Sequence, residues 1–184
     1  MAPARGIASE QQGQAQGMGL LIAALGATLA AIVESSVLTQ LLIGGVKPDL
    51  VLSLSLSMAM VLGFEYGMVW AVVGGLLLDF LLPERVVGST MLALLLVTGA
   101  SLLVARLSEA PRLPIIALTV FILTFLYQAL LMLLLAVTTG SAIQSINGLS
   151  YALIALTNAV IAVLAAWVTR SMLERFGRTE RVAW

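Results

Sequence analysis

Long apolar runs separated by short breaks make up most of the chain. They cover residues 18–42, 50–62, 66–82, 88–105, 113–137 and 149–168, and glycine, proline or polar residues occupy the breaks. A helix needs about 20 predominantly apolar residues to cross the hydrocarbon core of a bilayer, and all runs but the second approach or exceed that length. The pattern predicts an all-α, polytopic membrane helix bundle with six transmembrane helices, in which short loops pack neighbouring helices antiparallel.

The second run, residues 50–62, is short for a membrane span. Its helix would be about 20 Å long, against a hydrocarbon core of about 30 Å. It could be tilted, shielded by neighbours or re-entrant. The rival interpretation is one helix over residues 50–82, about 50 Å long, which would place Glu65 near the middle of the membrane. A hairpin that turns at residues 63–65 is the more economical prediction.

Composition agrees with a membrane protein and leaves no room for a soluble domain. Hydrophobic residues make up 61% of the 184 residues and charged residues 10%, whereas soluble domains are about 45–50% apolar and about 25% charged. We expect three parts: a flexible cytoplasmic tail over residues 1–17, the transmembrane domain over 18–168 and a basic cytoplasmic tail over 169–184. The tail could instead continue the last helix onto the membrane surface, where arginines meet lipid headgroups.

The distribution of lysine and arginine predicts the orientation. With six helices and both termini in the cytoplasm, seven of the nine basic residues lie inside, while Lys47 and Arg85 lie outside. A five-helix arrangement gives the same seven-to-two ratio, so charge does not decide the number of helices. Both arrangements place the C-terminus in the cytoplasm.

The residue types that are missing restrict the chemistry. The chain contains no cysteine and no histidine, which removes the thiol nucleophile, the imidazole base and the usual zinc and haem ligands. No glycine-rich phosphate loop or catalytic serine motif occurs. We therefore expect no enzymatic activity, no cofactor and no metal. The formal net charge of zero gives no sign of a nucleic-acid surface.

Polar side chains within or beside the apolar runs are the candidate functional residues. A charge at the bilayer centre costs about 2.5–3.5 kcal/mol even on insertion scales, so such groups should face the bundle or a cavity. In the six-helix arrangement several of them come to the outer face, which predicts a polar site or partner contact there. The alternative is a set of structural carboxylates paired with Lys47 or Arg85. The candidate outer-face residues are Glu34, Lys47, Pro48, Asp49 and Asp79.

Two further features predict helix packing. Small residues recur every four positions at Gly63, Gly67, Ala71 and Gly75, in register with Asp79, so they form one stripe that lets another helix approach closely. The stripe is interpreted as packing within the bundle, with a partner helix as the alternative. Gln128 and Asn158 lie inside the fifth and sixth runs, where we expect hydrogen bonds between helices.

Taken in order, these motifs resemble a known family. The elements are GGVKPDL at residues 44–50, the glycine-rich hairpin at 63–67, GGLLLD at 74–79 closing at Pro83, Tyr127 followed by Gln128, and Asn158 before a basic tail. Over roughly residues 20–178 the chain resembles the MreD family of rod shape-determining membrane proteins. The architecture of that family is similar to the substrate-binding component of energy-coupling-factor transporters.

The resemblance implies a function without chemistry of its own. It implies an inner-membrane adaptor and regulator of the bacterial cell-elongation complex, which binds the scaffold protein MreC. Through MreC it would couple the MreB cytoskeleton to peptidoglycan synthesis by RodA and a class B penicillin-binding protein. The alternative is the small-molecule-binding component of a vitamin-type transporter, in which Glu34, Asp49 and Asp79 would surround the ligand. A membrane lipid could also be the ligand.

Overall fold

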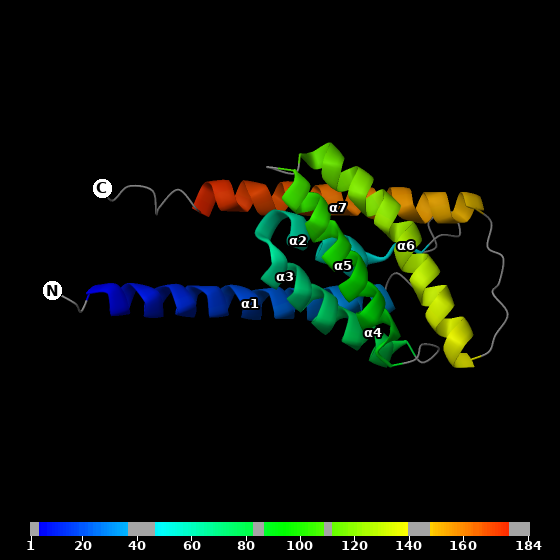
Figure 1. Cartoon of the computed structure of the whole chain (residues 1–184), viewed down its shortest axis with the longest axis horizontal. Coiled ribbons are helices and arrows are strands. Elements are labelled where there is room, and N and C mark those ends of the chain that lie inside the picture. The colour runs from blue at the N-terminus through cyan, green and yellow to red at the C-terminus, as the bar shows by residue number, and fades with distance from the viewer. Residues whose placement is uncertain (1–3, 37–46, 83–86, 109–111, 140–147, 177–184) are drawn as a thin grey trace.

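A computed structural model describes residues 4–36, 47–82, 87–108, 112–139 and 148–176. These residues are almost entirely helical and include no strand (Figure 1). Five stretches are long and apolar enough to cross a membrane, so the prediction of a multi-pass helical membrane protein is confirmed. The elements are α1 (Ala4–Ser36), α2 (Leu50–Leu62), α3 (Phe64–Val69), the π-helix η1 (Trp70–Gly74), α4 (Gly75–Leu81), α5 (Ser89–Leu107), α6 (Leu113–Thr139) and α7 (Gly148–Phe176).

The first and last helices are longer than their apolar runs. Helix α1 begins at Ala4, within the tail that the sequence predicted to be flexible. Its early residues are mostly alanine, glutamine, glutamate and arginine, which have high helix propensity and can extend an adjoining helix beyond the apolar segment. Helix α7 continues to Phe176, beyond the predicted end at 168. Residues 177–184 of the basic tail lie outside the described residues.

The chain reverses direction at Gly63, between α2 and α3. Gly63 has φ 103° and ψ −174°, a conformation with positive φ that side-chain-bearing residues rarely adopt. The two helices then pack closely, because a Cβ at Gly67 would lie 2.7 Å from the Cα of Ala59. The predicted hairpin is confirmed, and the alternative of one continuous helix over 50–82 is wrong.

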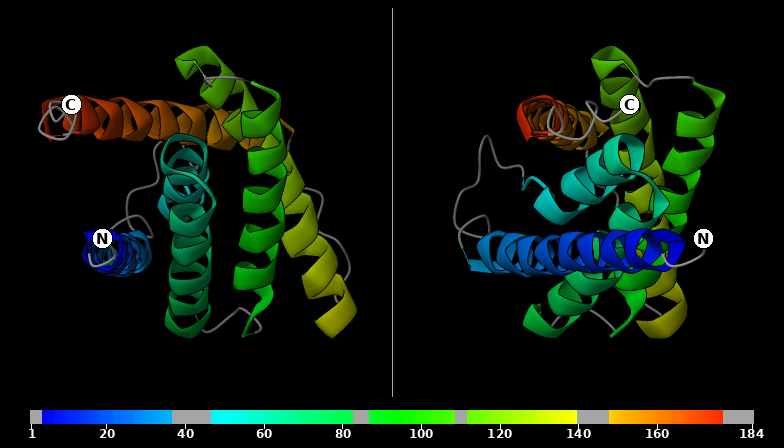
Figure 2. Two further views of the ribbon diagram at one scale, coloured as in Figure 1. Left: turned by 60° about the vertical axis from the view of Figure 1, so that its left-hand side comes forward. Right: turned by 90° about the vertical axis from the view of Figure 1, so that its left-hand side faces the viewer.

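Helix α2 occupies the centre of the molecule, between α1 and α7 (Figure 2). Eight of its 13 residues are buried. Its first turn lies beside the end of α1, because the backbone N–H of Val51 donates a hydrogen bond to Glu34. Its end lies near the middle of α1, since Leu62 and Gly19 line the same cavity. Helix α2, which is about 20 Å long, therefore runs roughly antiparallel to α1.

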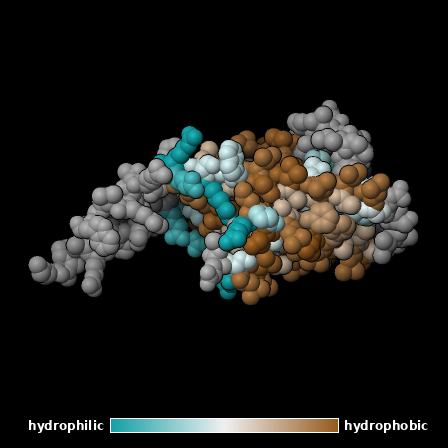
Figure 3. Space-filling model, turned by 90° about the horizontal axis from the view of Figure 1, so that it is seen from above, coloured by the Kyte–Doolittle hydropathy of each residue, from teal (hydrophilic) through white to brown (hydrophobic). Residues whose placement is uncertain are grey.

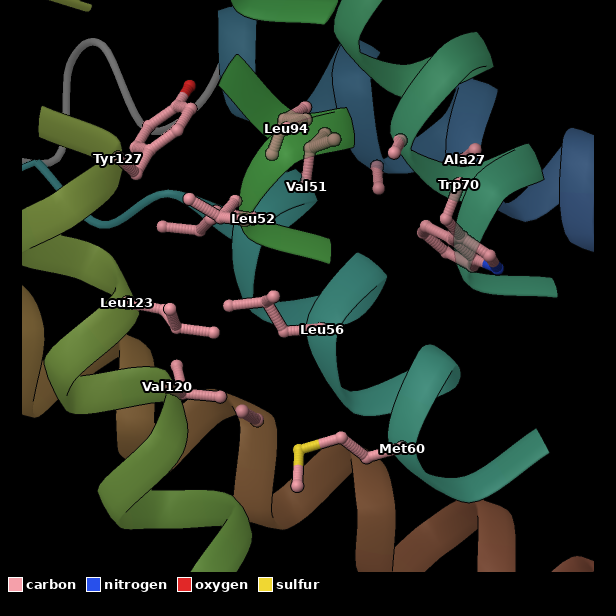
Figure 4. Close-up of a cluster of buried hydrophobic side chains, with 14 of the residues drawn as sticks. Ala27, Val51, Leu52, Leu56, Met60, Trp70, Leu94, Val120, Leu123 and Tyr127 are labelled. Atoms are coloured by element: carbon pink, nitrogen blue, oxygen red, sulfur yellow. The ribbon is translucent and has the colours of Figure 1, made fainter. Parts of the chain in front are cut away.

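The packed interior surrounds α2. Leu52, Leu56 and Met60 of α2 extend toward Val120 and Leu123 of α6 (Figure 4). All five side chains are buried. Lipid tails are as apolar as leucine, so such contacts stabilise the bundle in a membrane through close van der Waals packing more than through exclusion of water.

The surface has the polarity expected of a membrane protein. Large apolar side chains such as Leu21, Leu25 and Leu103 are exposed, and hydrophobic residues cover the body of the molecule (Figure 3). Hydrophilic residues gather in a band near one end. The beginning of α1 and the end of α7 lie at the same end of the molecule (Figure 1).

Candidate functional site

The start of α2 is capped by a carboxylate from another helix. Asp49 occupies the N-cap position, with φ −100° and ψ 94°, but its side chain makes no capping hydrogen bond. The carboxylate of Glu34 on α1 takes this role and accepts a hydrogen bond of 2.8 Å from the backbone N–H of Val51. Free N–H groups and the helix dipole both favour a negative charge at this position. Glu34, which is 1% exposed, therefore connects α1 to α2.

The carboxylate of Asp49 is bound by amide side chains of two other helices. The Nε2 of Gln128 on α6 donates to its Oδ2 at 3.1 Å, and the Nδ2 of Asn158 on α7 donates to the same oxygen at 3.4 Å. In return, the backbone N–H of Asp49 donates to the Oδ1 of Asn158 at 2.9 Å. Asp49 therefore joins α2 to both α6 and α7.

Thr124 completes this polar cluster, which we define as Glu34, Asp49, Thr124, Gln128 and Asn158. The Nδ2 of Asn158 contacts the Oγ1 of Thr124 at 3.5 Å, and Thr124 donates to the carbonyl of Val120 at 2.8 Å. Every member except the half-buried Gln128 is buried. Buried polar groups are stable when they satisfy one another, and a satisfied network fixes the relative positions of the elements that carry it.

Asp79 binds at a different helix. Its carboxylate accepts hydrogen bonds from the backbone N–H groups of Gly88, Thr90 and Met91, at 2.9, 3.0 and 3.3 Å. Three N–H groups at the first turn of α5 are thereby satisfied by one buried side chain from α4. Asp79 therefore caps α5, whereas Glu34 caps α2 and the carboxylate of Asp49 binds side chains of α6 and α7.

The other two candidate outer-face residues precede α2 directly. Pro48 is buried, and Lys47 is half-buried at the first described position of this segment. Proline removes one backbone N–H at the approach to the helix and fixes its own φ, which suits a position just before a helix start. Arg85, the alternative partner of the carboxylates, lies outside the described residues.

The stripe of small residues contacts two different helices. A Cβ at Gly75 would lie 2.7 Å from the Cα of Met91, so this end of the stripe packs on α5, whereas Gly67 packs on α2. Ala71 is fully buried between them, and Gly63 forms the turn with open space around it. The π-helix η1 lies within the stripe, and its extra residue per turn rotates the faces before and after it relative to each other.

Among the described residues, no group of three or more acidic, histidine or cysteine side chains could hold a metal ion. The serines of α2, Ser53, Ser55 and Ser57, donate to carbonyls of their own helix at 2.9 to 3.0 Å. The hydroxyls are therefore satisfied within the helix, as serine in a membrane helix commonly is.

Sequence patterns did not indicate that Asp49, Gln128 and Asn158 meet. Gln128 and Asn158 were predicted to make bonds between helices, but their common partner is 79 and 109 residues away along the chain. The only available signal was that each of these polar residues needs a partner in an apolar environment. No family model, curated protein or solved structure matches the chain.

Proposed function

We propose that the chain crosses the bacterial cytoplasmic membrane six times, with both termini in the cytoplasm. Five spans come from the long apolar helices and the sixth from α2. Two observations support this count. Helix α2 runs roughly antiparallel to α1, and the start of α1 lies at the same end of the molecule as the end of α7, as an even number of spans requires. A helix of about 20 Å is short for a span. Burial of α2 among its neighbours keeps its polar ends within protein rather than in lipid.

Within that topology, the protein acts as a non-enzymatic adaptor of the cell-elongation complex. Like the MreD family that it resembles, it binds MreC and through it couples MreB to the wall synthases, RodA and a class B penicillin-binding protein. The observation that carries this proposal is the cross-linking of α1, α2, α6 and α7 by the polar cluster. Such cross-links favour a fixed bundle that presents constant outer surfaces to partner proteins.

The same observation favours an adaptor over a vitamin-binding transporter component. A binding site for a small polar molecule has a cavity with a few polar groups directed into it. Here Glu34 and Asp79 accept hydrogen bonds from helix N-termini, and Asp49 accepts them from two amides. The cavity between α1, the α2–α3 hairpin and α7 has mainly apolar walls. The three carboxylates that would surround a ligand in the transporter alternative thus make hydrogen bonds that hold helices together.

A pull-down from native membranes tests the proposal. The tagged chain is expressed at its normal level, extracted with a mild detergent and isolated, and its partners are identified by mass spectrometry. We expect the bitopic scaffold protein and the wall synthases to be enriched. The matched control is a tagged, unrelated six-helix protein of the same membrane, which should recover neither.

The alternative outcomes are distinct. Recovery of a coupling helix-bundle subunit with paired ATPases would identify the chain as a transporter component and contradict the adaptor function. Recovery of none of these proteins, from a preparation that remains monodisperse and helical, would contradict both assignments. A complementation assay adds a second readout, because loss of an adaptor of lateral wall synthesis should convert rods to spheres.

A further inference from the structure

A cavity of about 430 Å³ lies between α1, the α2–α3 hairpin and the last turns of α7. Its walls include Gly19 and Gly26 of α1, the rings of Tyr66 and Trp70, and Met172 of α7. No part of the polar cluster lines it. No sequence pattern indicates this cavity, because its walls come from three segments that are distant along the chain.

Two glycines of α1 make room for the aromatic walls. A Cβ at Gly26 would lie 2.9 Å from the Cζ2 of Trp70, and a Cβ at Gly19 would lie 2.6 Å from the Oη of Tyr66. Both rings therefore pack directly against the backbone of α1. Trp70 is also the first residue of η1, and π-helical turns often occur at functional sites. The packing fixes the positions of these walls.

The walls suit a hydrocarbon. Glycine, alanine, leucine, isoleucine, methionine and aromatic side chains form nearly all of the surface. The one aliphatic hydroxyl, that of Thr169, contacts the sulfur of Met58 at 3.8 Å. A polar ligand would lose its hydration in such a cavity and find few hydrogen bonds in return, at a cost of about 1–3 kcal/mol per unpaired group.

The dimensions suit one flexible chain. Along α1 the cavity extends from Gly19 to Gly26, about 10 Å. Its volume of about 430 Å³ leaves room for several methylene groups in line.

The position favours a lipid that lies at the membrane surface. The cavity is next to charged residues at the end of α7, Arg170, Glu174 and Arg175, of which the last two are exposed. Hydrophilic residues gather near that end of the molecule (Figure 3). A phospholipid anchored there would have its phosphate and glycerol among charged side chains and its acyl chain directed into the apolar interior.

We propose that this cavity binds one acyl chain of a membrane phospholipid, held between α1, Trp70 and α7. The proposal does not depend on the adaptor function, since it rests on the cavity alone. A bound chain would fill a space that otherwise lacks van der Waals partners on one side. It would also connect α1 to α7, which face each other across the cavity.

Quenching of Trp70 fluorescence by a brominated lipid tests the proposal. Trp167 and Trp184 are replaced by phenylalanine, and the protein is reconstituted into vesicles of phosphatidylcholine with or without bromine on its acyl chains. Trp70 is only 8% exposed, so lipid around the bundle has little access to its ring. We expect at least a twofold loss of Trp70 emission in the brominated vesicles.

Variants that fill the cavity provide the specific readout. Ala23→Phe and, independently, Met172→Phe place a ring in the cavity and should each reduce the quenching at least twofold. The matched controls are Leu25→Phe on α1 and Leu164→Phe on α7, whose side chains are 66% and 57% exposed on the lipid-facing surface. Both controls should leave the quenching unchanged.

A second single-tryptophan protein calibrates contact with bulk lipid. Trp167, which is 57% exposed, is retained while Trp70 and Trp184 are replaced, and its emission should be quenched in the presence or absence of the filling substitutions. The proposal is overturned if Trp167 is quenched and Trp70 is not, which would indicate a cavity closed to lipid or reserved for a protein side chain. Equal quenching of Trp70 in the filled and control variants would also overturn it.

Discussion

Two buried aspartates in this bundle lie next to the starts of helices, but their hydrogen-bond partners lie at very different separations along the sequence. Asp79 binds backbone groups of α5 that follow it by 9 to 12 residues. Asp49 binds side chains of α6 and α7 that are 79 and 109 residues away. The first carboxylate completes a local helix-loop-helix unit, and the second joins elements from the whole chain.

The difference shows what each carboxylate can contribute. A helix cap stabilises by about 0.5–2 kcal/mol and can be replaced in part by water or by a shorter polar side chain. A buried network loses more when one member is removed, because the remaining donors keep the cost of desolvation without a partner. The two aspartates should therefore respond differently to the same substitution.

The largest effect is expected for Asp49→Leu. This change removes the carboxylate that accepts from Gln128 and Asn158, although Asn158 keeps its contact with Thr124. Unfolding should become easier by about 2–4 kcal/mol, from about 1–3 kcal/mol for the unpaired amide of Gln128 and about 1 kcal/mol for the lost hydrogen bond of Asn158. Titration with a denaturing detergent in mixed micelles measures the loss. Glu174→Leu, at an exposed position of α7, is the control and should change stability by no more than about 0.5 kcal/mol. Equal losses would show that Asp49 is not a cross-link.

A second substitution separates the elements that Asp79 joins. Gly75→Ala places a Cβ 2.7 Å from the Cα of Met91, so α4 and α5 must move apart, and overpacking of this kind costs about 1–3 kcal/mol. Melting of the purified protein should occur at a lower temperature. Gly99→Ala on α5, where no atom lies within 4 Å of the new Cβ, is the matched control and should be neutral or slightly stabilising. If both glycines tolerate alanine equally, the close contact is absent in the membrane.

A smaller effect is expected for Asp79→Ala. Loss of a helix cap should lower stability by about 1 kcal/mol, and Asp79→Asn should lose less, because its amide oxygen can still accept from Thr90 or Met91. Hydrogen exchange should increase at the first turn of α5 and remain unchanged at α2. An increase at α2 of similar size would mean that the two aspartates belong to one network.

The smallest effect is expected for Gln128→Leu. Gln128 is half-buried, and interhelical hydrogen bonds in membranes average about 0.6 kcal/mol. In a double-mutant cycle, the same substitution in an Asp49→Ala background should be neutral or stabilising, because the shared hydrogen bond is already lost and the substitution removes the unpaired amide. A full additional loss in that background would show that Gln128 stabilises the bundle through some other contact.

The sequence by itself determined the class of protein, the helices and the turn between α2 and α3. Apolar length predicts spans because the bilayer has a fixed thickness, and glycine at a position such as Gly63 predicts a break because few other residues adopt its backbone conformation. The need of Glu34, Asp49 and Asp79 for partners also follows from the sequence, since a charge in an apolar medium is costly. The boundaries of α1 and α7 were less predictable, because polar residues with high helix propensity continue a helix without an apolar signal.

Only the tertiary structure decided which side chains become hydrogen-bond partners of the buried carboxylates. The order of the helices along the chain does not specify which helices face one another, so it does not predict that Asp49 meets Gln128 and Asn158. The cavity beside Trp70 forms where α1, the hairpin and α7 leave space between them. Periodicity describes one helix at a time and contains no information on the rotation and depth of its neighbours. Those are set by close contacts such as Gly67 against Ala59, where the absence of a side chain allows two backbones to approach.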